Sequence, residues 1–551
     1  MATHHSTTDT STTDTSSSRP LRLLGLMLAA VVLGLPHGLS AQDADADTIL
    51  QHIPYEVGVA EPPVEPGTIL RAMTLEQAID RALENNLDVQ SARLGPQIQA
   101  YSLGAAEAAF NPSFNATVGH NSSTNQSTSQ LDGGREITTD RNTFNFGLSQ
   151  PLPWYGGELS ASFNNARTST DNVFATRNPN YNSNLSFSYT QPLLAGRRID
   201  TQRNQVRTQQ VQREISDVQL RSQIDDITAL VRTAYWNLRS QIEQIEIQRR
   251  NLAQAEQLLA NNRIRVEQGT MVPMELAQAE AQVASAQQAL LNAEIQWRTQ
   301  ERNFKQLVAG GSDDAIFQET INPVDLPEVV EREVDIEAAV EMALGNRPEV
   351  LQQTMQREIS EMNLEVSRDN VRPNLNLSAS YSLQGVGGDL FDRDGLGGSP
   401  ELVQSGGYRD ALSSIGSLDT PTFNVSLNFS YPLGTRASEL NLEQARLQLR
   451  QTDMAMAAQE LAIRTEVTNA GMAVSNTFLQ LEAARRSREA AERSVEAELT
   501  RFQVGASTNF QVAAAQDNLT QMRLSELQAT INHINAIAEF ERVQGLGWGN
   551  R

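Results

Sequence analysis

The stretch "RVEQGTMVPMELAQAEAQ", residues 265–282, returns 236 residues later as "RFQVGASTNFQVAAAQDN", residues 501–518. Each glycine lies between two long helical patterns, and glycine readily ends a helix in a left-handed conformation. Neither copy contains a catalytic group. We therefore expect the same helical hairpin twice in one chain, with these equivalent pairs: Arg265 and Arg501, Gly269 and Gly505, Ala277 and Ala513, Ala279 and Ala515.

The repetition extends over most of the chain. The segment "LEQAIDRALENNLDV" from Leu75 matches "IEAAVEMALGNRPEV" from Ile336 at an offset of 261 residues. The later offset is 236 residues, so the first half contains a longer insert. A tandem duplication of this kind predicts two structural repeats. The predicted segments are repeats at 75–308 and 336–544, a linker before them at 42–74, an equatorial linker between them at 309–335, and a tail at 545–551.

Composition excludes several classes of function. The chain has 66 acidic and 43 basic residues, which argues against nucleic acid, whose phosphates attract basic surfaces. It has no cysteine, so disulfides, thiolate metal sites and a lipidated amino-terminal cysteine are excluded. Of the six histidines, the three outside the predicted signal peptide, His52, His120 and His533, lie far apart in sequence. No metal, cofactor or catalytic cluster is expected, and the chain is interpreted as a protein that is not an enzyme.

The amino terminus has the layout of an export signal. Arg19 and Arg22 precede the apolar run "LLGLMLAAVVLGL", residues 23–35, and small residues follow. This pattern predicts a signal peptide over 1–41, cleaved after Ala41. An uncleaved membrane anchor is the alternative.

Two regions, 112–192 and 373–432, alternate apolar residues with Ser, Asn, Thr or Gly, which is the period-two pattern of β-strands. Six segments alternate in this way, four in the first region and two in the second, and they include "ELSASFNNARTST" from Glu158. Asn and Ser are weak strand formers, so their regular use on one face favours a water-filled lumen opposite lipid. A half-buried sheet in a water-soluble domain is the alternative.

The connections between these segments differ in length. Most are long and polar, but "PLPWYGG" is short, and its Trp154 and Tyr155 are expected at the membrane interface. Six strands are too few to close around a channel, so the predicted barrel is shared between chains.

Two segments, 200–268 and 436–504, carry apolar residues every seven positions. As helices each would be about 100 Å long, and the seven-residue period predicts a coiled coil. A second stripe predicts packing on both sides, as in a wall of helices. The first heptad series is Ile224, Val231, Leu238, Ile245, Leu252, Leu259 and Val266; the second is Val467, Val474, Leu481, Val495 and Phe502; the extra stripe is Leu440, Leu447, Met454 and Leu461.

Each repeat is also predicted to contain two shorter helices, one before its strands and one after its long helix. The return helices are expected at 273–308 and 509–544, and helices at 75–110 and 336–371 precede the strands, the latter interrupted at Pro348. Two short helices laid end to end match the length of one long helix. The repeated glycine turn then joins a long helix to its return at the far end of a tube.

With this organisation the chain resembles the TolC-like outer-membrane efflux protein family. The duplicated halves, the element order and the two Arg-x-x-x-Gly turns carry the resemblance, with "TQPLLAG" and "SYPLGTR" at the strand-to-helix junctions. The resemblance implies a homotrimer in the Gram-negative outer membrane, whose β-barrel continues as an α-helical barrel across the periplasm. Relatives usually contribute four strands each, whereas six per chain predict an 18-stranded barrel.

The resemblance also implies partners. The hairpin tips would dock onto a periplasmic adaptor (membrane fusion) protein, which connects to an inner-membrane pump or ABC transporter in a tripartite efflux or type I secretion system. The turns here depart from the family's usual Val-Gly-Leu or Val-Gly-Thr, which leaves the identity of the partner open. The expected docking residues are Arg265, Gly269, Thr270, Arg501, Val504, Gly505 and Ala506.

Acidic residues near the tips suggest a second site. In a trimer they would form stacked rings that favour cations in a narrow tunnel, and a solvated outer helix face is the alternative. The candidates are Glu256, Glu492, Glu496 and Glu498.

The leading hypothesis is therefore a passive exit duct for an inner-membrane transporter. A periplasmic coiled-coil adaptor or spacer is the alternative, although it would not need Asn/Ser-faced strands with long loops. A periplasmic enzyme lacks the nucleophile and base it would need. The transported substrate is not indicated by the sequence.

Overall fold

The structure is a computed structural model, and it describes residues 60–64, 67–127, 134–326, 329–395, 398–434 and 436–546. The predicted signal peptide and most of the linker before the first repeat lie outside these residues, as does the end of the tail.

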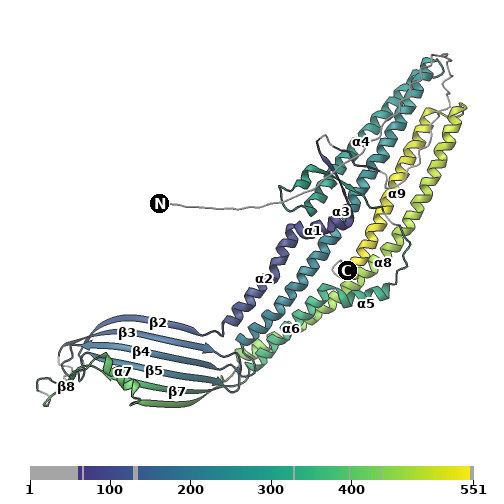
Figure 1. The fold of residues 1–551 in the computed structure, drawn as a ribbon. Helices are drawn as coiled ribbons and strands as arrows, with labels where there is room; N and C mark the ends of the chain where they lie inside the picture. The colour runs from purple at the N-terminus through teal and green to yellow at the C-terminus, as the bar shows by residue number, and fades with distance from the viewer. Residues whose placement is uncertain are drawn as a thin grey trace, which may run out of the picture. The chain divides into compact units, whose positions relative to one another are not determined.

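A six-stranded antiparallel sheet forms one end of the described fold (Figure 1). Its strand order is β10-β7-β5-β4-β3-β2, so the six segments predicted as strands form one sheet, and the segment "ELSASFNNARTST" is β4. The strands are β2 (Ser113–Gln126), β3 (Glu136–Pro151), β4 (Glu158–Thr170), β5 (Asn180–Pro192), β7 (Asn374–Gly387) and β10 (Pro421–Ser430).

The two faces of this sheet differ sharply in chemistry. Directly opposed residues share a face, so the ladder register sorts the side chains into rows. An apolar row runs across all six strands through Phe423, Tyr381, Phe187, Ala161, Leu148 and Phe114. The next row consists of polar residues and one glycine: Thr422, Ser382, Ser186, Ser162, Gly147 and Asn115.

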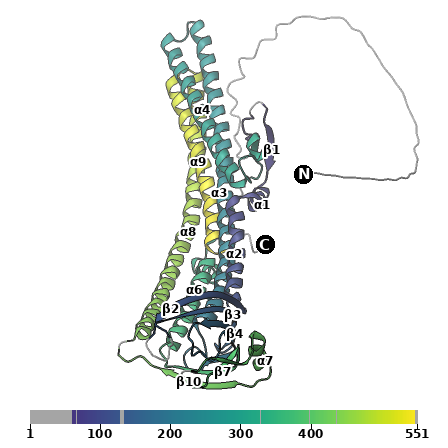
Figure 2. The ribbon, with the colours of Figure 1, turned by 90° about the vertical axis from the view of Figure 1, so that its left-hand side faces the viewer.

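Two long helices, α3 (Thr201–Glu267) and α8 (Ala437–Gln503), extend from the sheet to the two hairpin tips. Each has 67 residues, where the sequence patterns predict 200–268 and 436–504. The helices α4 (Pro273–Val308) and α9 (Asn509–Val543) return along them. Nearer the sheet, α2 (Leu87–Ala108) packs on α3, and α6 (Pro348–Asp369) packs on both α8 and α3. Figures 1 and 2 show α2 and α4 following one another along α3.

The helix expected at 75–110 is in fact two helices, which corrects the sequence interpretation. It breaks at Asn86, between α1 (Leu75–Asn85) and α2, and the Asn86 side chain accepts hydrogen bonds from the amides of Asp88 and Val89. The second repeat breaks at the equivalent place, between α5 (Ile336–Asn346) and α6, where Pro348 begins the new helix. Both breaks therefore have a local cause, a side-chain cap in one and a proline at the first turn in the other.

The heptad residues form the core between the helices. Val231, Leu238 and Ile245 of α3 are buried, as are Val467 and Val474 of α8, which pack against Phe540 of α9. The second α8 stripe is different: Leu440, Leu447, Met454 and Leu461 are between 61% and 66% exposed in the single chain. One seam of α8 is thus buried within the chain and the other is not.

The two linkers contain structure that the sequence did not indicate. Strands β1 (Ile69–Met73) and β6 (Glu319–Pro323) pair in parallel, next to the short 3₁₀-helix η2 (Ala315–Gln318). Tyr235 and Trp236 of α3 are buried here as packing residues, and the Tyr235 hydroxyl donates to the Met73 carbonyl at 3.0 Å. Among the described residues no helix is long and apolar enough to cross a membrane.

Two further strands and a helix lie in the connection between β7 and β10. The strands β8 (Leu390–Asp392) and β9 (Glu401–Gln404) form a small antiparallel pair, and α7 (Tyr408–Gly416) follows them.

Candidate functional site

The two hairpin tips share one backbone geometry. Gly269 and Gly505 both have φ of +74°, which confirms the left-handed conformation expected for them. At the first tip the amide of Thr270 donates to the Arg265 carbonyl at 2.9 Å and that of Gly269 to Val266 at 3.0 Å. At the second tip Ala506 donates to Arg501 and Gly505 to Phe502. This double closure is the Schellman motif. In both copies the arginine supplies the carbonyl of the outer hydrogen bond, and the glycine comes one residue before the amide that closes it.

The side chains of the two arginines have different roles. Arg265 lies over the ring of Phe502, with its guanidinium carbon 4.5 Å from the ring centre, and so connects the two hairpins. Arg501 is exposed and pairs with Glu498 of its own helix at 3.4 Å.

The return helices begin at well-defined caps. Pro273 occupies the first turn of α4, and Thr508 caps α9 in a capping box with Gln511. Beneath the tips, Phe502 packs with Leu258 and Val512. The outer surface is left with exposed apolar side chains, among them Val504 at 76% and Phe510 at 68%, beside the exposed backbone of both glycines. Such a patch at the end of a rigid hairpin pair suits binding to another protein.

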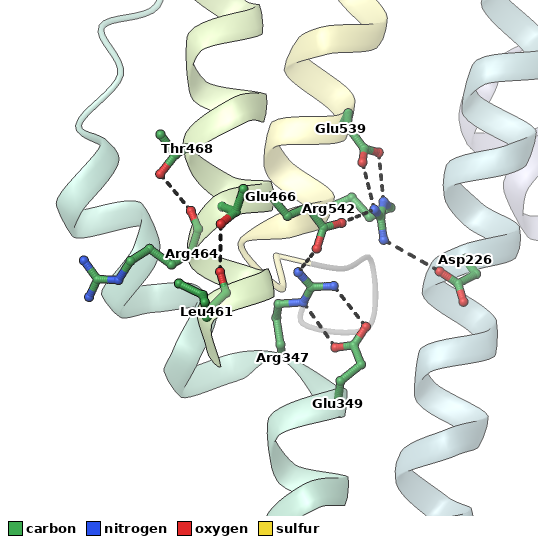
Figure 3. A network of polar contacts seen from close by, with 10 residues as sticks. Asp226, Arg347, Glu349, Leu461, Arg464, Glu466, Thr468, Glu539 and Arg542 are labelled. Atoms are coloured by element: carbon green, nitrogen blue, oxygen red, sulfur yellow. Dashed lines mark hydrogen bonds and ion pairs between the residues drawn. The ribbon is translucent and has the colours of Figure 1, made fainter. Parts of the chain in front are cut away.

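A charged network joins four helices near the break between α5 and α6 (Figure 3). Arg347, just before Pro348, pairs with Glu349 at 3.1 Å and with Glu466 of α8. Arg542 of α9 pairs with the same Glu466 at 2.9 Å and approaches Asp226 of α3 at 3.9 Å. Although burial opposes it, hydrogen bonding to Arg347 holds the pKa of Glu349 below its ordinary value. These ion pairs connect the break between α5 and α6 to both long helices, α3 and α8.

Asp225 lines a cavity of about 100 Å³ beside this network. Burial and the nearby charges of Asp226 and Glu349 raise its pKa above the ordinary 3.8. The folded state therefore binds the Asp225 proton more tightly than the unfolded state does. Protonation of Asp225 stabilises the fold, and this contribution is fully present below pH 3.8 and is lost as pH rises through the raised pKa.

We expect Asp225→Asn to raise Tm at neutral pH, because it removes the unfavourable charge. The gain should disappear as pH falls below 3.8, where the natural carboxyl is neutral in both states. Circular dichroism melts across this pH range measure the difference. Glu256→Gln, at an exposed position of the same helix, is the control, and an equal gain for both variants at neutral pH would contradict the assignment.

The four acidic candidates lie in different surroundings. Glu492 accepts an ion pair from Arg488 at 2.7 Å and another from Arg523 of α9 at 3.3 Å. Glu498 pairs with Arg501 and accepts a hydrogen bond from Ser507. Glu256 and Glu496 are exposed. The chain thus neutralises Glu492 and Glu498 internally, because arginines of the same hairpin face them.

Trp154 and Tyr155 lie in the turn between β3 and β4, at the end of the sheet next to the helices. Both are 60% exposed, and the Arg197 guanidinium lies over the Tyr155 ring.

Among the described residues no group of His, Asp or Glu is arranged to hold a metal ion.

A family model described as outer membrane efflux protein matches residues 78–157, 158–310 and 339–545. The chain belongs to this family. The match covers both repeats, both hairpin tips and all six strands of the sheet. A comparison with curated protein sequences gave no match.

Solved structures of outer membrane proteins share the fold. The Campylobacter jejuni CmeC outer membrane channel aligns with a TM-score of 0.62 at 15% identity, over 86% of this chain and 85% of that one. The Vibrio cholerae outer membrane protein VceC aligns with a TM-score of 0.61 at 14% identity, over 86% and 96%. The Neisseria gonorrhoeae MtrE outer membrane channel aligns with a TM-score of 0.57 at 16% identity, over 86% and 88%.

Proposed function

We propose that this chain is one protomer of a trimeric exit duct, which passively conducts substrates from an inner-membrane transporter across the periplasm and the outer membrane. The sheet is the observation that carries the proposal. Its Ser/Asn face suits a water-filled lumen, and its apolar face suits lipid. The family match supports the same function, and the alternative of an adaptor or spacer leaves such a sheet without a use.

The edges of the sheet support a shared barrel. Within the described sheet, β2 and β10 each pair on one side only, and unpaired edges are unstable in lipid. The strand β2 runs away from the helices and β10 runs back toward them, so β10 of one copy can pair antiparallel with β2 of the next. Three copies would close an 18-stranded barrel, wide enough for an aqueous channel.

The helices offer matching surfaces for the same assembly. The exposed α8 stripe runs along one side of the helical layer, and α2 carries exposed apolar side chains of its own. A helix with a second apolar seam packs against a second neighbour. In the proposed trimer the α8 stripe of one copy packs on the α2 residues of the next: Leu87, Leu94, Ile98 and Tyr101.

A pair of charge substitutions tests the trimer. We expect Leu447→Arg with Leu461→Arg to yield a folded monomer, because the interface would then bury two unpaired cations. Native mass spectrometry of the detergent-extracted protein measures the assembly. Gln448→Arg with Ala462→Arg places the same charges at exposed positions one residue further on and should leave the trimer intact. A trimer that survives the first pair would exclude this interface.

The tips are proposed to dock onto a periplasmic adaptor protein, which links the duct to a pump or ABC transporter. Three chains with two hairpins each present six similar tips. The tips are not identical, however, because Arg265 is held against Phe502 whereas Arg501 is exposed. We infer that Arg501, Val504 and the glycines contact the adaptor directly, and that Arg265 fixes the spacing between the tips.

We propose an acidic ring in the tunnel for the two exposed glutamates only, Glu256 and Glu496. We expect Glu256→Gln with Glu496→Gln to lower the cation preference of the channel, because the charges in a narrow throat set its field. Glu492→Gln with Arg523→Gln removes both members of an ion pair, so it keeps the net charge and should leave the preference unchanged. Reversal potentials in planar bilayers under a salt gradient measure both. An unchanged potential in the double variant would exclude the ring.

A further inference from the structure

The helix α7 lies against the six-stranded sheet, near its end away from the long helices (Figure 1). It contacts β7 and β5 and buries Ala411 and Ile415 against them. The connection between β7 and β10 therefore does not simply cross from one strand to the next, because part of it folds back over the strands.

Two glycines show which face α7 covers. A Cβ on Gly385 would lie 1.8 Å from the carbonyl oxygen of Ala411, and one on Gly387 would lie 2.1 Å from that of Gly407. Side chains alternate along a strand, so these glycines share the face of Tyr381 and Leu383. The helix consequently lies on the apolar face of the sheet and not on the Ser/Asn face that would line a lumen.

The helix α7 lies where the apolar side chains of β4, β5 and β7 stop. Along β7 the apolar residues run from Leu375 to Leu383, about 27 Å of strand. At a strand tilt of about 40° this covers about 21 Å of height, most of the ~25 Å apolar band of an outer-membrane barrel. Beyond them the next row of the same face carries Asn165, Ser183 and Gly385 on β4, β5 and β7, while Phe144 and Val118 continue it as apolar residues on β3 and β2. Asn165 and Ser183 are buried, so α7 covers the polar surface just beyond the band.

Specific contacts hold α7 in this place. The Tyr408 hydroxyl donates to the Asn165 side-chain oxygen at 2.8 Å, and its ring meets Phe144 edge-on with centroids 5.4 Å apart. The Asp410 carboxylate accepts from the Gly407 amide at the start of the helix. The outer side of α7 presents Arg409, Leu412 and Ser413, all exposed. A cation, an apolar side chain and a hydroxyl side by side suit the boundary between lipid headgroups and acyl chains.

We propose that α7 lies outside the barrel wall, at the level of the outer-leaflet headgroups, with Arg409 on anionic headgroups and Leu412 toward the acyl chains. The inference rests on the proposed barrel, because only a barrel in the membrane makes the apolar face of the sheet the lipid face. It adds a lipid-contact element made by a connection that would otherwise be assigned to the channel mouth.

The absence of cysteine from the chain allows a direct test. Single variants Leu412→Cys, Val425→Cys and Ser426→Cys are labelled with an environment-sensitive nitrobenzoxadiazole maleimide. The labelled trimer is reconstituted in vesicles of phosphatidylcholine and phosphatidylglycerol. Quenching is measured with nitroxide on the lipid headgroup, nitroxide on the acyl chain, and aqueous iodide. Val425 and Ser426 of β10 are adjacent and lie on the apolar and polar faces, so they report lipid and lumen.

We expect headgroup nitroxide to quench the Leu412 probe, acyl-chain nitroxide to quench the Val425 probe, and iodide alone to quench the Ser426 probe. A Leu412 probe quenched by iodide alone, beside a lipid-quenched Val425 probe, would overturn the placement of α7 and leave the barrel standing. A Val425 probe untouched by either nitroxide would overturn the barrel itself. Adding Gly387→Val, which displaces α7, should abolish headgroup quenching at Leu412 and leave Val425 unchanged.

Discussion

Gly269→Trp with Gly505→Trp is expected to abolish export while leaving a folded trimer. Neither glycine has an atom within 4 Å of the position that a Cβ would take, so each indole projects into solvent from the tip. The cost to folding is that of a side chain at positive φ, about 1–2 kcal/mol per residue. In contrast, two bulky side chains on every protomer would obstruct the whole ring of proposed adaptor contacts.

Accumulation of a fluorescent efflux substrate in cells that carry the matching adaptor and transporter measures this loss. Gly395→Trp is the matched control, because Gly395 also has a positive φ and open space around its Cβ position but lies between β8 and β9. Normal export by the double Trp variant would contradict docking at the tips. A missing trimer would instead assign the glycines to folding.

Glu243→Leu is expected to cost about 3–5 kcal/mol of stability, because it leaves the buried charge of Arg239 unpaired. The two side chains form an ion pair at 2.7 Å on α3, with exposures of 4% and 0%. Arg239 also donates to the carbonyls of Pro323 and Ala60 at 2.8 and 3.3 Å. The variant should therefore lower Tm and open the segment around β1 to protease before the rest of the chain.

The chain supplies a matched control for this variant. Glu246→Leu breaks a pair of the same i,i+4 spacing, with Arg250 at 2.8 Å, but about a quarter of each of these side chains is exposed. Its expected cost is therefore no more than about 1 kcal/mol. Combining Arg239→Met with Glu243→Leu should recover much of the loss, since no unpaired charge remains. Equal losses for Glu243→Leu and Glu246→Leu would show that burial of the first pair has no special effect.

Local patterns predicted the elements of this fold because their periods are local. Alternation from Phe423 to Tyr431 is a property of adjacent residues, and the heptads of α3 repeat within two turns, so strands and long helices were predicted from the sequence alone. The break at Asn86 was missed, although Asn followed by an acidic residue at 88 is a helix-start signal. The helical pattern continues on both sides of Asn86, so the cap was read as part of one helix.

The sequence patterns could not predict contacts between residues that are far apart in the chain. The strands β1 and β6 have five residues each and pair in parallel across more than two hundred residues, so no local period connects them. The partners of Glu492 are hidden for the same reason, because Arg523 lies on the returning helix. Glu256 and Glu492 each lie 13 residues before a tip glycine, but arginines neutralise only the second.

The order of strands in the sheet has a consequence for how the chain folds after export. The strands β2, β3, β4 and β5 pair with their neighbours in sequence, so these hairpins close over short loops and form early. The sheet then grows only through the ladder from β5 to β7, which joins Tyr181 to Gly387. Until α3, α4 and the helices after them have been delivered, the edge of β5 stays open. During this interval the chain is most prone to aggregation, because an open strand edge can pair with another chain.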